Sequence, residues 1–311
     1  MNKINTWRRV AAGVMALAAT TLMQPAHAAL RVFACEPEWA ALVQELGGPL
    51  VEVAVATHAL QDPHQIQAKP SLIARARNAE LVVCTGAELE IGWLPVLLQQ
   101  SGNPKIQPGQ LANFAAADFV RKLDVPTQLD RAQGDVHAAG NPHIQTDPRN
   151  ITGVARALAS RLQQIDPAHA AEYATRSADF MQRWQSAITR WSTLAAPLRG
   201  VAVASQHKAF GYLYDWLCLK EVAVLEPKPG VEPSVAHLQH VMAALKATPA
   251  RMVIVAAYQD PRPALWLQNN AGVPAVTLPF TVGGSDGAKK DLFALFDDTI
   301  ARLLAAAGSG R

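Results

Sequence analysis

Charged residues, aromatic residues and cysteines are all scarce in this 311-residue sequence. Charged side chains make up 17% and aromatic side chains 6%, whereas half of the residues are apolar. This composition excludes a disordered chain, which combines high charge with few apolar residues. The length is sufficient for one large domain or two of ordinary size, each with its own core.

The net charge of +3 belongs entirely to the N-terminus. Residues 1–28 contain Lys3, Arg8 and Arg9 and no acid, so the rest of the chain has equal numbers of basic and acidic residues. A neutral chain with no basic stripe is a poor binder of nucleic acids or anionic membranes. We therefore expect no nucleic-acid partner.

Apolar runs long enough to cross a membrane are absent after residue 28. The N-terminal run from Val10 to Met23 has 14 residues, fewer than the roughly 20 that cross a bilayer, so a membrane anchor is disfavoured. Basic residues precede this run and Ala26-x-Ala28 follows it, which is the pattern of a signal peptide with its cleavage site. We predict a signal peptide over residues 1–28, cleaved after Ala28, and export of a soluble chain.

The three cysteines are too few for a disulfide-based scaffold. Cys35, Cys84 and Cys218 form an odd set, so at least one of them stays unpaired or pairs between chains. Cys35 and Cys84 both stand near the ends of expected strands, where they could form a disulfide. Two buried apolar cysteines are an equally open interpretation.

Short apolar runs alternate with amphipathic stretches along the chain. This alternation is typical of parallel sheets covered by helices on both faces, so we predict an α/β fold with mainly parallel sheets. Residues from about 114 to 147 are expected to be irregular. The expected strands are residues 31–34, 51–56, 81–84, 201–204, 252–256 and 275–278. The expected helices are residues 39–46, 71–78, 209–217, 235–246, 263–270 and 290–305.

One further helix is predicted to be unusually long. Asp166-Pro167 is a typical helix start, and no helix breaker follows until about Ala196. About 30 residues at 1.5 Å each give about 45 Å, enough to run across two lobes. We predict two α/β lobes, residues 29–165 and 198–311, joined by one rigid helix over residues 166–197. Its apolar stripe consists of Tyr173, Phe180, Trp184, Ile188, Trp191 and Leu194.

Three histidines occupy settings that suit a binding site. His64 follows Asp62-Pro63, His143 follows Asn141-Pro142, and His207 comes just after the expected strand 201–204. Ligands of open α/β sheets bind at the carboxyl ends of strands, where His64 and His207 are expected. The spacing matches no zinc-finger pattern. A site made from all three must be assembled from both lobes, in the cleft between them.

The order of these motifs resembles the cluster A-I solute-binding proteins, which are the metal-binding receptors of zinc and manganese ABC importers. The resemblance covers essentially the whole chain after the signal peptide. It implies two α/β lobes joined by a rigid helix, and one divalent metal ion in the cleft with His64, His143 and His207 as ligands. The resembling segments are Asp62-Pro63-His64 with Lys69-Pro70-Ser71, Asn141-Pro142-His143 with Asp147-Pro148, residues 205–213 and residues 229–234.

The chain departs from this family at the fourth ligand. Family members usually place a carboxylate where this chain has Thr277-Leu278-Pro279-Phe280. Asp286, in a glycine-rich loop nearby, is our candidate for that ligand, and Asp260, Glu232 or water are the alternatives. The long histidine-rich loop of many zinc receptors is missing. His137 is the only nearby substitute, and it is either a metal relay or a solvated loop residue.

The donor set predicts zinc as the bound ion. Three neutral imidazoles plus an oxygen donor suit tetrahedral zinc, whereas manganese prefers more oxygen ligands. Copper or nickel would also bind such donors. We expect each histidine to be oriented through its second ring nitrogen, with Asp147 and Glu232 as candidate partners.

Together these features predict a periplasmic receptor, monomeric and not an enzyme, that captures zinc and passes it to the membrane permease of an ABC importer. The sequence has no phosphate-binding Gly-Lys-Ser/Thr loop, so ATP is expected to be hydrolysed elsewhere. A secreted zinc hydrolase is an alternative, since three histidines with an open position also form a catalytic arrangement, but no His-Glu-x-x-His helix is present. A receptor for a chelated metal is a second alternative.

Overall fold

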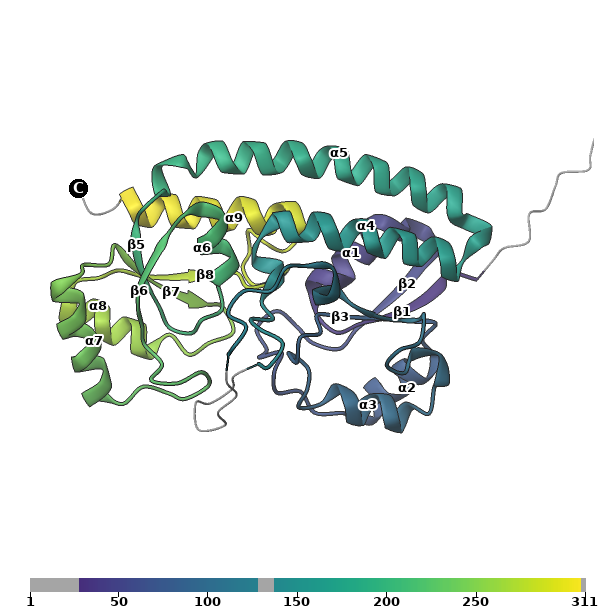
Figure 1. The fold of residues 1–311 in the computed structure, drawn as a ribbon, viewed down its shortest axis with the longest axis horizontal. Coiled ribbons are helices and arrows are strands. Elements are labelled where there is room, and N and C mark those ends of the chain that lie inside the picture. Colours follow the sequence, from purple (N-terminus) through teal and green to yellow (C-terminus); the bar gives the residue numbers. More distant parts are fainter. Residues whose placement is uncertain (1–27, 128–136, 309–311) are drawn as a thin grey trace, which may run out of the picture.

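The computed structural model describes residues 28–127 and 137–308, which form two lobes (Figure 1). Within these residues each lobe contains a four-stranded parallel sheet. None of the helices in the two described segments has both the length and the apolar content that a membrane crossing requires. The expected signal peptide falls on residues 1–27 and the adjoining Ala28, so it lies almost wholly outside the described residues.

The N-terminal sheet has the strand order β2-β1-β3-β4, and each pairing is parallel. Every residue of β3 is buried, as expected for a strand covered on both faces. From β1 the chain continues to β2 on one side and then crosses to β3 on the other side of β1. The direction of the connections therefore changes between β1 and β3, and ligands of such sheets bind at this switch point. The elements of this lobe are β1 (Leu30–Ala34), α1 (Pro37–Gly47), β2 (Val51–Val55), α2 (Pro70–Asn78), β3 (Leu81–Cys84), α3 (Leu94–Ser101) and β4 (Asn113–Ala115).

The C-terminal sheet repeats this topology with the strand order β6-β5-β7-β8. The two lobes are therefore copies of one architecture, although the sequence itself shows no strong internal repeat. The elements of this lobe are β5 (Ala202–Ser205), α6 (Gly211–Leu217), β6 (Lys220–Val224), α7 (Val235–Ala247), β7 (Met252–Ala256), α8 (Arg262–Ala271), β8 (Ala275–Leu278) and α9 (Leu292–Gly308).

A disulfide joins the carboxyl ends of β1 and β3. In the parallel register Ala34 lies opposite Val83, so the next residues, Cys35 and Cys84, stand side by side with their Cα atoms 4.8 Å apart. Of the two interpretations left open by the sequence, the disulfide is the one found. Cys218 is an exposed free cysteine.

The long helix is present, but it is shorter than predicted. Helix α4 (Pro148–Ile165) ends before it, residues 167–169 form a 3-10 turn, and α5 runs over Ala170–Leu194, which is about 37 Å at 1.5 Å per residue. Asp166 is the cause, because its backbone N–H still closes α4 on Leu162 while its carboxylate accepts bonds from the His169 ring and the Tyr173 hydroxyl. Leu194, expected on the apolar stripe, is 51% exposed at the end of α5.

Helix α5 spans both lobes, with α4 beneath one end and α9 beneath the other (Figure 1). Trp184, in the middle of α5, is fully buried. Its indole N–H donates to the carbonyl of Pro148 at the start of α4, and its ring contacts Phe293 and Phe296 of α9. One continuous core cluster includes buried residues of both lobes, and smaller clusters lie on the outer face of each sheet. The two lobes are thus built on a shared core.

Four elements lie where the sequence analysis assigned none: α3, α4, β4 and β6. Strands β4 and β6 are at the edges of their sheets. Strand β4 has only three residues and β6 begins with Lys220 and Glu221, so neither has a clear apolar run. Helix α4 is the clearest omission, because Asp147 is its N-cap and Pro148 its first residue, the same signal that was assigned to Asp166-Pro167.

Candidate metal centre

Three histidines that are far apart in the sequence meet between the lobes. His64 follows β2, His143 precedes α4, and His207 follows β5. Each offers a ring nitrogen to one cluster in which all three nitrogen atoms lie within 4.8 Å of one another. The ring centre of His143 lies 5.5 Å from the ring centre of His64 and 5.5 Å from that of His207. The ring centres of His64 and His207 are 6.2 Å apart. The convergence expected from the sequence is therefore found.

Two of these histidines, His64 and His143, are each held by a local turn of the same kind. The side-chain oxygen of Asp62 accepts both the backbone N–H of His64, at 3.0 Å, and its ring Nδ1, at 2.7 Å. The side-chain oxygen of Asn141 does the same for His143, at 3.0 and 2.8 Å. Asp-Pro-His and Asn-Pro-His are thus two copies of one device, in which a short polar side chain bonds to the residue two positions later.

His207 is oriented by a partner that comes just after the neighbouring strand, β6. Its Nδ1 lies 2.7 Å from Oε2 of Glu226, which also accepts the backbone N–H of Gly230 at 2.9 Å. Strands β5 and β6 are parallel and end with Ser205 opposite Val224, so His207 and Glu226, each two residues beyond the end of its strand, also lie side by side. The site therefore depends on the strand pairing.

These contacts fix which nitrogen of each ring is available. The carboxylates of Asp62 and Glu226 and the amide oxygen of Asn141 accept hydrogen bonds, so each Nδ1 carries a proton, and in the neutral ring each Nε2 then carries a lone pair. The Nε2 atoms of His64 and His143 are buried and have no hydrogen-bond partner among the described residues. Buried, unpartnered lone pairs aimed at one point are what a metal ion requires of imidazole ligands.

The electrostatics of the cluster keep a buried imidazole neutral. Burial lowers the pKa of His143 well below 6.5, and the charges that His64, His207 and His137 would carry lower it further. Burial alone would raise the pKa of Asp62, but the hydrogen bonds and charge of His64 outweigh it and lower that pKa. His143 is therefore a neutral donor at physiological pH, while Asp62 carries a negative charge behind His64.

The structure does not bring Asp286 to the cluster. Its side chain is 94% exposed and pairs with Lys289, which lowers the Asp286 pKa. The loop is anchored away from the site because Ser285 donates to Asp298 of α9 at 2.6 Å. Asp286 was predicted as a ligand because it is the acid nearest to residues 277–280 and its glycine-rich loop could fold over the site, but the sequence does not reveal which way such a loop faces.

The other expected acids also have different roles. Asp260 pairs with Arg262, and Glu232 is exposed. Asp147, expected to orient a histidine, instead caps α4 and pairs with Arg149. The orienting partners are Asp62, Asn141 and Glu226, of which the first two were already part of the motifs quoted from the sequence. Glu226 could have been found only by pairing β5 with the unpredicted strand β6.

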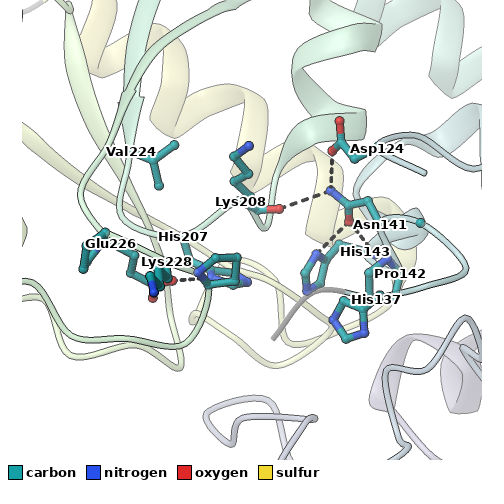
Figure 2. Close-up of a pocket in the computed structure, with 13 residues that line it drawn as sticks. Asp124, His137, Asn141, Pro142, His143, His207, Lys208, Val224, Glu226 and Lys228 are labelled. Atoms are coloured by element: carbon teal, nitrogen blue, oxygen red, sulfur yellow. Dashed lines mark hydrogen bonds and ion pairs between the residues drawn. The ribbon is translucent and has the colours of Figure 1, made fainter. Parts of the chain in front are cut away.

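A cavity of about 420 Å³ opens beside the histidines (Figure 2). Figure 2 shows His143 and His207 facing one another across it, with His137 below His143 and Asn141 above it. His137 was interpreted as either a relay or a solvated loop residue. Its ring in fact stacks on His64, with ring centres 5.3 Å apart, and lies 6.4 Å from His143. The lining residues include His137, Asn141, His143, His207, Glu226 and Lys228.

Comparison with known proteins places the chain in a family. Residues 32–306 match the family model described as zinc-uptake complex component A, periplasmic. The chain belongs to this family. Its members are solute-binding receptors and not enzymes, which removes the alternative of a zinc hydrolase.

Similar curated proteins bind zinc or manganese according to their names. The high-affinity zinc uptake system protein ZnuA of Paracoccus denitrificans is 23% identical over 283 residues, covering 80% of this chain and 83% of that protein. ZnuA of Yersinia pestis is 24% identical, over 58% of this chain and 60% of that protein. The manganese ABC transporter substrate-binding lipoprotein PsaA of Streptococcus pneumoniae is 20% identical, with coverages of 86% and 85%.

Solved structures share the fold. A crystal structure of ZnuA has a TM-score of 0.75 at 20% identity and covers 90% of this chain and 100% of that chain. The solute-binding protein FpvC from Pseudomonas aeruginosa, in complex with Mn²⁺, has a TM-score of 0.76 at 20% identity, with coverages of 91% and 100%. The predicted fold, two α/β lobes with parallel sheets, is confirmed.

Proposed function

We propose that this protein is a periplasmic receptor that captures a divalent metal ion, zinc in the first place, and delivers it to the membrane permease of an ABC importer. The observation that carries the proposal is the set of three converging imidazole nitrogens, two of them buried and without a hydrogen-bond partner in the described residues. His64 comes from one lobe and His207 from the other, so a bound ion would bridge the two. The family to which the chain belongs supports the same role.

The chemistry of the site favours zinc over manganese. Neutral imidazole nitrogens bind late divalent metals well, and tetrahedral zinc takes them at about 2.0–2.1 Å, whereas manganese prefers oxygen ligands. The ligand rings supply no charge of their own. The Asp62 and Glu226 carboxylates behind two of the rings supply two negative charges, which balance a divalent cation and make the imidazoles better donors.

Metal binding by purified mature protein tests the proposal. We expect one zinc ion per chain, and we expect His64→Ala, His143→Ala and His207→Ala each to lower zinc affinity by more than the roughly 10- to 100-fold that loss of an orienting partner costs. Two controls are available: His240→Ala removes an exposed imidazole from α7, and Asp286→Ala removes the exposed acid. Competition against a chelator measures the affinities. Undiminished binding in any of the three histidine variants would refute this set of ligands.

The mature form and the assembly state belong to the same proposal. We expect the exported protein to begin at Ala29, after removal of residues 1–28, and to act as a monomer. N-terminal sequencing of protein from the periplasmic fraction and light scattering of the purified protein check these two points.

A further inference from the structure

We propose that His137 is the fourth ligand of the metal ion, so that the bound ion has four imidazole donors and no protein oxygen. This inference rests on the proposed function, because it completes the same site. The three-histidine cluster leaves one position of a tetrahedral zinc ion open. Asp286, the acid expected there, points to solvent instead.

The position of the His137 ring is close to what a four-histidine site requires. A tetrahedral zinc ion with Zn–N bonds of about 2.0–2.1 Å places imidazole ring centres about 5 Å apart. The ring of His137 is centred 5.3 Å from His64 and 6.4 Å from His143. The corresponding distances among the three converging histidines are 5.5, 5.5 and 6.2 Å. The His137 ring is therefore about as near to His64 and His143 as those rings are to one another. Its nitrogen atoms are not in the group within 4.8 Å, so we expect the His137 ring to turn toward the ion on binding.

The backbone that follows His137 is held in place by several contacts. The N–H of Ala138 donates to the carboxylate of Glu88, and the N–H of Gly140 donates to the carbonyl of His137 at 3.1 Å. Gly140 has φ +96°, and a Cβ there would lie 2.7 Å from the carbonyl oxygen of Leu123, so only glycine fits. The turn that follows His137 leads directly into Asn141 and His143. The imidazoles of His137 and His143 thus belong to one segment whose backbone is held in place.

The backbone conformation of Glu88 is a second indication that the segment after His137 is held in a defined position. Glu88 has φ +68°, and its neighbour Ala87 has φ +48°, a left-handed conformation that residues other than glycine adopt at an energetic cost. Strained backbone of this kind persists where the surrounding structure holds it. Here it places the Glu88 carboxylate against the N–H of the residue after His137.

No described carboxylate competes for the fourth position. Asp62 and Glu226 are in contact with the histidines, but the carboxylates of both are engaged by Nδ1 atoms. The choice is therefore between His137 and water. Four nitrogen donors would discriminate against manganese more strongly than three, because manganese binds preferentially to oxygen.

X-ray absorption of the zinc-loaded mature protein decides between the two donors. We expect four imidazole ligands in the wild type and three in His137→Ala. Zinc affinity, measured by chelator competition, is expected to fall in His137→Ala by at least the roughly 10-fold that loss of an orienting partner costs, and to stay unchanged in His240→Ala. His137→Glu, which replaces nitrogen with oxygen, is expected to lower the ratio of zinc to manganese affinity relative to the wild type.

The results separate this inference from the function on which it rests. Three imidazoles in the wild type, together with wild-type zinc affinity in His137→Ala, would overturn the role of His137 and leave the proposed function standing. A wild-type protein that binds no zinc would overturn both. One zinc ion bound with reduced affinity by His137→Ala, with one imidazole fewer, supports both.

Discussion

At the scale of single residues, the site is defined by how each imidazole is aimed. Asp62 and Asn141 stand at the same place in two matching turns, yet one is charged and the other is neutral. The chain thus contains its own comparison between a carboxylate and an amide as the partner of a histidine that we propose as a ligand. The amide suffices for orientation, so the charge of Asp62 must act on donor strength and on the attraction of the cation.

Substitutions at Asp62 separate these two effects. We expect Asp62→Ala to lower zinc affinity about 10- to 100-fold, because both the turn and the ring orientation are lost. Asp62→Asn should cost less, because its amide oxygen can accept the same two bonds, as Asn141 does for His143. Chelator competition at pH 7 measures both variants. Equal losses in the two would mean that charge alone, and not orientation, is what Asp62 provides.

The sequence indicated the three converging histidines, our proposed ligands, more readily than their surroundings. His64 and His143 could be predicted because proline and a polar residue precede each within three positions, so the motif is local. Glu226 could not, because its place beside His207 depends on the pairing of β5 with β6. His137 had no distinguishing local signal, and its stacking on His64 is a tertiary contact.

At the scale of elements, strands with strong apolar runs could be predicted and edge strands could not. Residues 81–84, 252–256 and 275–278 were expected with the bounds that the structure has. Strand β6 escaped notice because Lys220 and Glu221 are exposed at a sheet edge, where alternation is weak. The break between α4 and α5 was missed because Asp166-Pro167 both ends one helix and precedes the next. The lobe boundaries at residues 165 and 198 stay predictions.

Packing of α5 against α4 and α9 should dominate the stability of the region where the lobes join. Trp184→Ala removes ring contacts with Phe293 and Phe296 and a hydrogen bond to Pro148, so we expect it to lower the free energy of unfolding by about 3–5 kcal/mol. Urea denaturation measures this loss. Leu194→Ala, at the exposed end of the same helix, should change it by no more than about 0.5 kcal/mol. A small effect at Trp184 would contradict the shared core.

At the scale of the whole molecule, a buried contact links the two lobes directly. The hydroxyl of Thr281, in the C-terminal lobe, donates to the carboxylate of Glu38 on α1 in the N-terminal lobe. Burial raises the pKa of Glu38 to about 7. A raised pKa means that the folded state binds a proton more tightly than the unfolded chain does. The stabilisation from this group is therefore complete below about pH 4.5 and is lost as the pH rises through about 7.

Replacing Glu38 with a neutral residue of the same shape should remove the loss of folding stability that accompanies ionisation of Glu38 at high pH. Glu38→Gln can still accept the Thr281 hydroxyl, so we expect the metal-free variant to be more stable than the wild type at pH 8, and the two to differ less at pH 5. Urea denaturation at both pH values measures the difference. Glu52→Gln, at an exposed position of β2, serves as the control. A wild type as stable as Glu38→Gln at pH 8 would show that the carboxyl is not buried as described.

The matching turns before His64 and His143 have a consequence for the energetics of capture. Because each ring is already aimed, an arriving ion exchanges its hydration water for donors that need little further ordering, and the entropic penalty of binding is small. Such preorganisation favours scavenging from dilute solution. The same rigidity is expected to make spontaneous dissociation of the ion slow. Release of the ion would then depend on the membrane permease that receives it.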